Sequence, residues 1–547
     1  MDGYGIGIDT GGTFTDAAVM NLATGDVVAT GKTRTTHYDL SQCIRTAINT
    51  ALNADGVIRD QVRLVAFSTT LATNTVVESR NGNVGLFIIG SKQKMNLPVV
   101  DAAYIKGGHK LNGEEEDPLD LETLVRAAQS FKGDVDAYAV VSAMSFINPT
   151  HELVTTKALS MVDDKPVFRS SEASKQPGMM ERAATAVLNA GLMPVMQNFL
   201  QGIRQGLEQE ELQCTCAVIR GDGYGMDLDA TITKAAETIA SGPAATAFFG
   251  AGLCNCEDAI IVDIGGTTTD VTMLQDGNPV VNENGINVEH MHTHIQAVEM
   301  STSGIGGDTH IHFSANRLQL AQNRVQPLCM ATEIPSPEQW LGKDTASSCF
   351  SLTPNLSDEI IKTDPILQAL KNDGPASATT LMERTGIPEM TTMRRLENHV
   401  RTLNVLEHGF TPTDILHALG RLDMGSVAAS QKAAEVLARF CDTSVEDFLN
   451  TALGMVYDRI EDAILQQALV KEGSSHALSM LASRRTFSTV NVGFSLNIPI
   501  IGIGAAAREL LPKVAERLQT TVSFPDHYEV GNAIGALRIA QRTQADS

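Results

Sequence analysis

The sequence has little positive charge for its length. Its 547 residues contain 41 Lys and Arg but 64 Asp and Glu, which gives a formal net charge of −23. A polyanion is not attracted to a nucleic-acid backbone or to an anionic membrane surface. We therefore expect no nucleic acid and no membrane among its partners, and the acidity is expected to serve solubility.

Long hydrophobic runs and a targeting leader are missing as well. No run of 18 apolar residues occurs, so no membrane-spanning helix is expected. Met1 leads almost directly into the strand-like segment YGIGID, without the basic and then apolar stretch of a signal peptide. These features predict a cytoplasmic protein whose eight cysteines are reduced.

Length and composition indicate the fold class. A chain of 547 residues is too long for one hydrophobic core, and two to four domains are expected. A hydrophobic content of 43% with 45 glycines is typical of a globular α/β protein.

One octapeptide motif occurs twice in the sequence. Residues 9–16 read DTGGTFTD and residues 263–270 read DIGGTTTD. Each copy lies between two apolar segments, which predicts a strand, a glycine turn and a second strand. A Walker-type loop would instead open a helix and carry Gly-Lys-Ser/Thr, and neither copy does so. We expect two β-hairpins, one in each of two related lobes.

Both copies carry residues that suit a phosphate group. Glycines without Cβ let an anion approach the backbone N–H groups, threonines add hydroxyl donors, and strand-end aspartates can hold hydrated Mg²⁺. The alternative is a tight turn with an Asp-capped loop, but two copies after two strands favour two phosphate clamps facing across a cleft. Asp16 and Asp270 have the further alternative of bonding only their own hairpin backbone. The clamp residues are Asp9, Thr10, Gly11, Gly12, Thr13, Asp263, Gly265, Gly266, Thr267 and Thr268.

Paired hairpins of this kind resemble those of the actin, sugar-kinase and Hsp70 ATPase superfamily. The resemblance implies a glycine-rich turn before a helix that holds the nucleoside, and residues 498–518 (IPIIGIGAAARELLPKVAERL) match it with Gly502 and Gly504. Residues 530–540 are similar to the small-residue helix that crosses between lobes. The implied fold is α/β, a two-lobed actin-like ATPase with ribonuclease-H-like lobes, and the implied cofactors are ATP and Mg²⁺.

A narrower resemblance is to the hydantoinase A/oxoprolinase family. It rests on these segments, in family order: GIGIDTGGTFTDAAV, FSTTLATNTVVE, FINPTHE, ERAATAVLNA, TIASGPAATAFFGA, VDIGGTTTDVTML and GFTPTDILHALG. Family members use ATP to phosphorylate the amide oxygen of a cyclic amide or activate a carbonyl compound similarly, and a B subunit completes the reaction. The resemblance implies catalytic roles for Asp9, Asp263, Thr13 and Thr267. It also implies a hydantoin, 5-oxoproline or lactam-like substrate, a hydantoinase B-type partner and a hetero-oligomer.

The chain departs from the family pattern in two places. Typical A subunits continue beyond the segment AIGA, and their longer glycine run after the second hairpin is here STSGIGGDT, residues 301–309. These departures keep a second function open, namely an ATP-driven activase or conformational switch that acts on a partner protein.

Histidines are concentrated in residues 289–313, which hold five of the 13 in the chain. On extended strands His290, His292 and His294 would share one face, and so would His310 and His312. Such imidazoles could bind zinc, manganese or iron, or move a proton. The alternative is a polar, exposed strand pair. His292 and His294 are the candidates for a second divalent metal.

Two shorter motifs have competing interpretations. His151 and Glu152 either line a site at a strand end or begin a helix, with Thr150 as N-cap and Glu152 on the dipole. The CTC and CNC pairs at 214–216 and 254–256 are spaced too closely for a zinc knuckle and favour structural thiols. An Fe–S cluster between two chains, as in some activases of the superfamily, is the alternative for these thiols.

The order of these features predicts the domain organisation. Residues within 366–410 read as three short helices in a helix-turn-helix order, and their basic and acidic side chains balance, so packing or partner contact is favoured over DNA binding. The predicted segments are a first lobe (1–75), an α/β region (76–250), a second lobe with the His-rich strands (251–360), a helical winged-helix-like insertion (361–410) and a helical region with the nucleoside turn (411–547).

Overall fold

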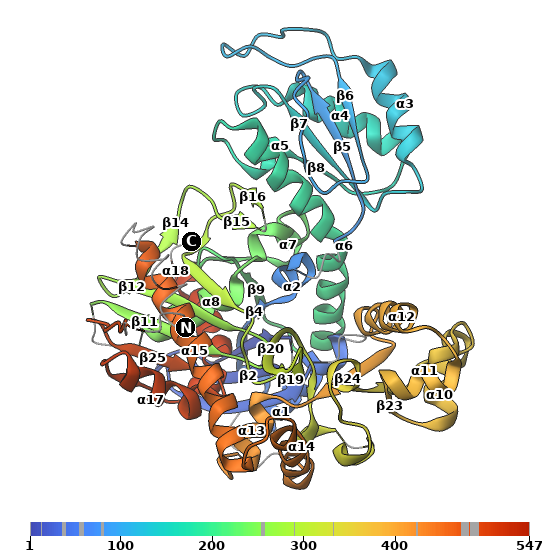
Figure 1. Ribbon diagram of the computed structural model, residues 1–547. Coiled ribbons are helices and arrows are strands. Elements are labelled where there is room, and N and C mark those ends of the chain that lie inside the picture. Colours follow the sequence, from blue (N-terminus) through green and yellow to red (C-terminus); the bar gives the residue numbers. More distant parts are fainter. Residues whose placement is uncertain are drawn as a thin grey trace. The chain divides into compact units, whose positions relative to one another are not determined.

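The chain folds into two compact units, which are described separately. The computed structural model describes residues 2–12, 14–35, 40–53, 59–77, 81–252, 257–288, 290–331, 333–422, 425–471, 481, 489 and 492–545. The first unit comprises Met1–Glu257, Thr272–Glu299 and Val530–Ser547, and the second comprises Asp258–Val271 and Met300–Glu529 (Figure 1). The division falls inside strand β12 (Thr269–Gln275). In the part of the chain that the structure describes, no helix is both long and apolar enough to cross a membrane.

The first unit is built on a six-stranded sheet in the order β10–β9–β4–β1–β2–β3. Strand β1 pairs antiparallel with β2 and parallel with β4, and β4 pairs parallel with β9. A hairpin extended by parallel strands needs helical crossovers, which places helices over the sheet. The strands are β1 (Tyr4–Thr10), β2 (Phe14–Asn21), β3 (Val27–Arg34), β4 (Val62–Thr69), β9 (Thr215–Ile219) and β10 (Gly225–Met226).

Small residues let helices approach both faces of this sheet. On one face, a Cβ at Gly7 would lie 1.8 Å from the carbonyl oxygen of Ala533 in α18 (Gly531–Ala545). Because neighbouring residues on a strand face opposite ways, Ile8 and its partner Ala17 face the other side. There Gly31, paired with Ala17, packs against α1 (Leu40–Leu52). A second close approach joins α18 to α8 (Ser241–Ala251), where a Cβ on Gly535 would lie 1.9 Å from the Ala245 oxygen.

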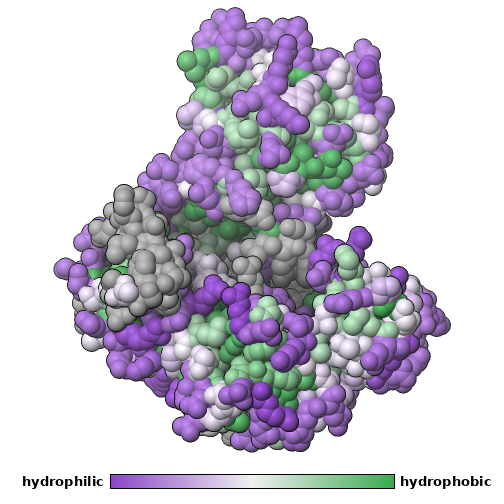
Figure 2. Space-filling view, in the orientation of Figure 1, coloured by the Kyte–Doolittle hydropathy of each residue, from purple (hydrophilic) through white to green (hydrophobic). Residues whose placement is uncertain are grey.

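A smaller, all-parallel sheet also belongs to the first unit. Its order is β6–β5–β7–β8, and its strands are β5 (Val84–Ile89), β6 (Asp101–Ile105), β7 (Ala137–Ser142) and β8 (Val167–Arg169). Helices α3 (Leu121–Phe131) and α4 (Thr150–Val162) enclose an apolar core around Phe87 and Tyr138, and much of the outer surface here is hydrophilic (Figure 2). The long helix α6 (Met179–Gln209) contacts both β7 and α1 and so connects the two sheets.

The second unit contains the other hairpin sheet. Its order is β13–β12–β11–β25–β26, with β18 (Met300–Ser303) pairing with β12; β13 (Asn278–Pro279) and the end of β12 are counted with the first unit. Strand β11 (Ala259–Ile264) forms a hairpin with β12 and pairs parallel with β25 (Ile500–Ile503), which pairs parallel with β26 (Val522–Ser523). Both units therefore contain a hairpin followed by two parallel strands. This arrangement confirms the predicted α/β class with two related lobes.

Other elements complete the second unit. A separate hairpin is formed by β19 (Thr309–Ser314) and β20 (Arg317–Arg324). Helices α13 (Pro412–Ala418), α14 (Val427–Phe440) and α15 (Val445–Lys471) pack in succession, and α17 (Ala507–Arg517) covers β25 and also contacts α15. The boundaries between the five predicted segments stay predictions.

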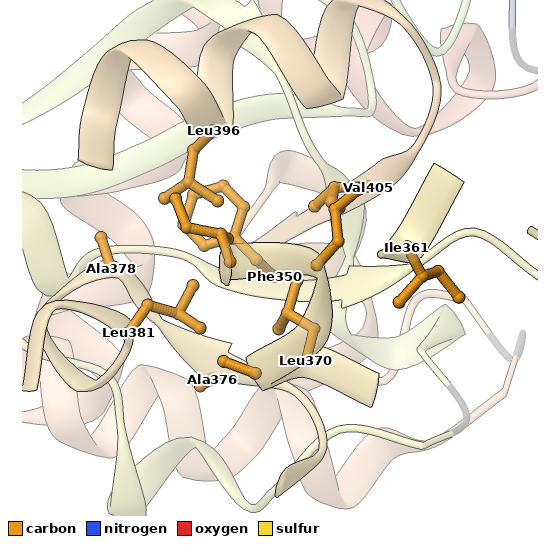
Figure 3. Close-up of a cluster of buried hydrophobic side chains, with 11 residues drawn as sticks. Phe350, Ile361, Leu370, Ala376, Ala378, Leu381, Leu396 and Val405 are labelled. Carbon is orange, nitrogen blue, oxygen red and sulfur yellow. The ribbon is translucent and has the colours of Figure 1, made fainter. Parts of the chain in front are cut away.

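The winged-helix-like insertion has its own core. Helices α10 (Pro365–Asp373), α11 (Ala378–Thr385) and α12 (Glu389–Arg401) pack against the antiparallel pair β22 (Cys349–Leu352) and β24 (Val405–Gly409), and Phe350, Leu370, Leu381 and Leu396 meet between them (Figure 3). Gly386, in the left-handed conformation at φ 68°, ends α11 and starts the turn into α12. The module enters and leaves at the paired residues Leu352 and Val405.

We expect Leu381→Ala to destabilise the insertion by about 2–5 kcal/mol, because it opens a cavity in this core. Leu381 is 0% exposed, whereas Met390, on the neighbouring helix, is 87% exposed and provides the matched control Met390→Ala. Hydrogen exchange of the α10–α12 amides should accelerate in the first variant and stay unchanged in the second. Equal exchange in both variants would contradict the packing in Figure 3.

Candidate functional site

The first glycine turn joins β1 to β2 and is closed by a backbone hydrogen bond. The N–H of Gly11 donates to the carbonyl oxygen of Phe14 at 3.0 Å. Asp9, 4% exposed near the end of β1, accepts from the Ser68 hydroxyl at 2.6 Å and from the Asn532 amide at 3.5 Å. A side chain from β4 and another from α18 therefore orient this carboxylate beneath the turn.

The other residues of the first copy differ from one another in burial and in their hydrogen-bond partners. Thr10 is buried, and in the described part of the chain its Oγ1 has no hydrogen-bond partner. Gly11 and Gly12 are half-buried, and Thr13 lies outside the described residues. Asp16 pairs with Lys32 on β3 at 2.8 Å, while burial raises its pKa and the ammonium partly opposes that shift. Asp16 thus has an ion-pair partner on the next strand.

The second glycine turn repeats the first. The N–H of Gly265 donates to the carbonyl oxygen of Thr268 at 3.0 Å, and Asp263 near the end of β11 is 8% exposed. The Thr268 hydroxyl donates to Asp270 at 3.4 Å, and the Thr267 hydroxyl accepts from the Arg324 guanidinium at 3.3 Å. The two copies therefore share sequence, strand placement and turn closure.

A glycine run braces this second turn. The N–H groups of Gly307 and Asp308 donate to the carbonyl oxygens of Gly265 and Gly266, at 3.0 and 2.6 Å. A Cβ on Gly306 would lie 2.6 Å from the Gly266 oxygen, so only glycine allows this approach. The shortened run STSGIGGDT therefore still reaches the turn.

The motif GFTPTD stabilises the glycine run through hydrogen bonds. Thr413 donates through its N–H and its hydroxyl to the carbonyl oxygen of Gly307. Thr411 and Asp414 form a capping box at the start of α13, and the buried Asp414 carboxyl also accepts from Cys329 N–H and the Ser430 hydroxyl. Burial raises the pKa of Asp414, and these hydrogen bonds oppose that shift.

The glycine turn that we expect to hold the nucleoside lies between β25 and α17, and its role in nucleotide binding stays a prediction. Gly504 has φ +90°, and a Cβ there would lie 2.5 Å from the Ile264 oxygen and 2.6 Å from Oδ1 of Asp263. A Cβ on Gly502 would lie 2.4 Å from the Phe524 ring. The turn and the second hairpin thus meet at the carboxyl ends of β11 and β25, the edge at which α/β sheets bind ligands.

These residues fit ATP and Mg²⁺ by their chemistry. The atoms of Ile264 and Asp263 next to Gly504 leave no room for a side chain there. Each hairpin turn has backbone amides, hydroxyls and a strand-end carboxylate. Magnesium takes one or two carboxylates together with water and phosphate oxygens, so single aspartates suffice. Asp9 belongs to the first unit and Asp263 to the second, and their opposition across a cleft stays a prediction.

The five clustered histidines separate into two sets. His292 is exposed and bonds Asn287 at 3.0 Å, whereas His294 is half-buried and burial lowers its pKa. Among the described residues no three His, Cys, Asp or Glu side chains are grouped to hold a metal, so a second metal at His292 and His294 stays a prediction. His310 and His312 face the same side of β19, with ring centroids 4.8 Å apart.

The pair His151–Glu152 begins a helix. Helix α4 starts at Thr150, and Pro149 takes the N-cap position that we had expected for Thr150. Glu152 is fully buried and accepts from Ser142 N–H and from the Ser170 hydroxyl, at 2.8 and 2.6 Å. It therefore ties the ends of β7 and β8 together.

The cysteine pairs are only partly described. Cys214 and Cys216 are free, half-buried thiols at the start of β9, whereas Cys254 and Cys256 lie outside the described residues.

Four supporting residues were not found from the sequence: Ser68, Asn532, Arg324 and Thr413. Three of them, Ser68, Thr413 and Asn532, lie within or beside segments that resemble family landmarks. The resemblance of those segments could have indicated that these residues support the site. Arg324, in the strand RLQLAQNR, carried none.

Two models of known families match the chain. Residues 5–162 match the model of the hydantoinase/oxoprolinase N-terminal region, and residues 182–337 match the hydantoinase/oxoprolinase model. The chain belongs to the hydantoinase A/oxoprolinase family.

Individual relatives are identical to this family member at about a quarter of the aligned positions. Caprolactamase subunit alpha of Pseudomonas jessenii is 27% identical over 348 residues, which cover 56% of this chain and 49% of the relative. The gamma subunit of acetophenone carboxylase from Aromatoleum aromaticum is 26% identical over 367 residues, 58% of this chain and 48% of the relative. The chain thus spans about half the length of the curated relatives it matches.

A solved structure establishes the fold of the family member. The nucleotide-free structure of acetone carboxylase superposes with a TM-score of 0.68 at 16% identity and covers 98% of this chain and 70% of that one. The predicted two-lobed α/β fold is therefore confirmed as a fold that this chain shares with that carboxylase.

We expect acid to destabilise the second unit through His310. Burial, together with neighbouring His312, lowers the pKa of His310 to about 3, below the ordinary 6.5. Its contribution to stability is therefore complete above pH 6.5 and is lost as the pH falls towards 3, by about 2 kcal/mol between pH 7 and 5.

Thermal unfolding measured between pH 7 and 5 checks this expectation. His310→Asn should show a shallower pH dependence than the unchanged protein. His292→Asn, at an exposed position, is the control and should keep the original dependence. The same slope in all three proteins would contradict a neutral, buried His310.

Proposed function

We propose that this chain is the ATPase subunit of an ATP-dependent cyclic amide hydrolase. It would phosphorylate the amide oxygen of a hydantoin, 5-oxoproline or lactam-like compound, or activate a related carbonyl compound, within a cytoplasmic hetero-oligomer. The observation that carries the proposal is the pair of glycine turns. Each turn is closed by a backbone hydrogen bond of the same length and is preceded by a buried aspartate near the end of a strand. A lactamase subunit and a carboxylase subunit among the relatives support a cyclic amide or carbonyl substrate.

The chemistry assigned to the two hairpins is phosphoryl transfer. The amide oxygen would form a bond to the terminal phosphorus of ATP as the bond to the ADP oxygen breaks. Catalysis of such a step consists mostly of positioning and charge stabilisation. The N–H groups at Gly12 and Gly266 and the hydroxyls of the adjacent threonines would bind phosphate oxygens, whereas the N–H groups of Gly11 and Gly265 close the turns and so shape the phosphate sites. Thr13 is included from the sequence alone.

The aspartates and the nucleoside turn would place the nucleotide. Asp9, oriented by Ser68 and Asn532, and Asp263, fixed beside Gly504, would hold Mg²⁺ through water, and the ion would neutralise charge on the phosphates. Gly502 and Gly504, which let β25 and its turn pack closely against Phe524 and the second hairpin, would shape the turn that holds the nucleoside at the start of α17. The second candidate metal at His292 and His294 has no assigned step.

We expect the purified chain to hydrolyse ATP slowly and to accelerate with one member of a panel of cyclic amides. Asp9→Asn should lower ATP turnover by about 100-fold or more, because a magnesium ligand is lost while the fold is kept. Asp26→Asn, on the exposed turn between β2 and β3, is the matched control and should match the unchanged protein. The measurement is ADP release with and without each amide.

Two results would contradict this assignment. Full turnover in Asp9→Asn would remove the first hairpin from the mechanism. Acceleration by a partner protein and by no amide would favour the activase or conformational-switch alternative.

We expect ring opening to need a second protein. The phosphorylated amide still has to be attacked by water, and the described residues contain no metal cluster of three ligands that could activate it. Without a hydantoinase B-type subunit, ADP should therefore form without an equivalent amount of ring-opened amino acid. Chromatography of both products with and without that subunit checks the ratio, and equal amounts from this chain alone would contradict the division of labour.

A further inference from the structure

Arg324 connects a separate hairpin to the second glycine turn. It is the last residue of β20, and its Nη1 donates to Oγ1 of Thr267 at 3.3 Å. The two residues are 57 positions apart in the sequence. A cationic side chain therefore contacts the one side-chain hydroxyl of this turn that the proposed function uses for phosphoryl transfer.

The backbone around Arg324 keeps this contact in place. In the β19–β20 pair, Arg324 lies opposite Thr309, the last residue of the glycine run. Val325 N–H donates to the carbonyl oxygen of Asp308 at 2.9 Å, and Asp308 N–H in turn donates to the carbonyl oxygen of Gly266. A short chain of backbone hydrogen bonds thus fixes the base of Arg324 relative to the turn that carries Thr267.

The chemistry of the guanidinium and the hydroxyl decides which of the two donates the hydrogen bond. A guanidinium keeps its charge at all physiological pH values and only donates hydrogen bonds. A hydroxyl that accepts from a cationic donor can donate its own hydrogen to an anion at the same time, and the cation strengthens that donation. Thr267 would therefore be a stronger donor to a phosphate oxygen when Arg324 is present.

We infer that Arg324 is a positioning residue that orients and polarises the Thr267 hydroxyl toward the terminal phosphate of a bound nucleotide. The inference rests on the proposed function, and it adds a residue that acts through Thr267. The effect should depend on the terminal phosphate, so ATP and ADP should respond differently when Arg324 is changed.

The experiment is a double-mutant cycle on the full chain. The variants are Arg324→Gln, Thr267→Val and the two combined, with Arg324→Lys as the conservative variant. The matched control is Arg317→Gln, the same substitution at the exposed, opposite end of β20. Two quantities are measured for each: the affinity for a non-hydrolysable ATP analogue and for ADP by calorimetry, and the rate of ATP hydrolysis.

We expect Arg324→Gln to lower the hydrolysis rate by about 100-fold, as for the loss of one transition-state donor. Its affinity for the ATP analogue should fall by about tenfold, and its affinity for ADP should stay unchanged. Arg324→Lys should lie between Arg324→Gln and the unchanged protein. The combined variant should be no worse than Thr267→Val, since the two residues act through one hydroxyl.

Several results would overturn the inference. Arg324→Gln with unchanged rate and unchanged analogue affinity would remove Arg324 from the site, and multiplied losses in the combined variant would show that it acts without Thr267. Equal loss of ADP and analogue affinity would indicate a structural role. If the unchanged protein neither binds nor hydrolyses ATP, the proposed function itself fails, a result visible before any variant is compared.

Discussion

The hydrogen bond that closes each glycine turn is the constraint on which the rest of the structure depends. It runs from Gly11 to Phe14 in one unit and from Gly265 to Thr268 in the other, at 3.0 Å in both. Closing the turn in this way leaves the strand-end aspartate below it and the adjacent amides near its surface. The contacts of Asp9, the glycine run and Thr413 each hold one of these turns in place or orient a side chain beside it.

The two turns are supported by different means. In the first unit, side chains from β4 and α18 contact Asp9 directly, so one carboxylate depends on residues at opposite ends of the chain. In the second unit, backbone groups of the glycine run contact the turn itself, and α13 holds that run through Thr413. The repeated octapeptide thus has the same local geometry in two similar sheets, but different contacts support each turn.

Local features could be predicted from the sequence, and long-range pairs could not. The hairpins, the nucleoside turn and the helices of the insertion follow from apolar patterns and glycine positions within short windows. The contacts of Asp9, Asp16 and Thr267 join residues on separate elements, and no pattern in a single sequence marks such pairs. Of the two interpretations of His151 and Glu152, the structure has the helix start, with Pro149 rather than Thr150 in the N-cap position.

The pairing of Leu352 with Val405 has a consequence for the history of the chain. Because residues 353–404 leave and rejoin one antiparallel ladder at neighbouring positions, they form a local module whose core is completed by Phe350 on β22 and Val405 on β24. A shorter ancestor could close β22 and β24 with a tight turn and keep every contact of the glycine run and of α13. Gain or loss of the module would then be a single local event at the level of the gene, independent of the residues that surround the two turns.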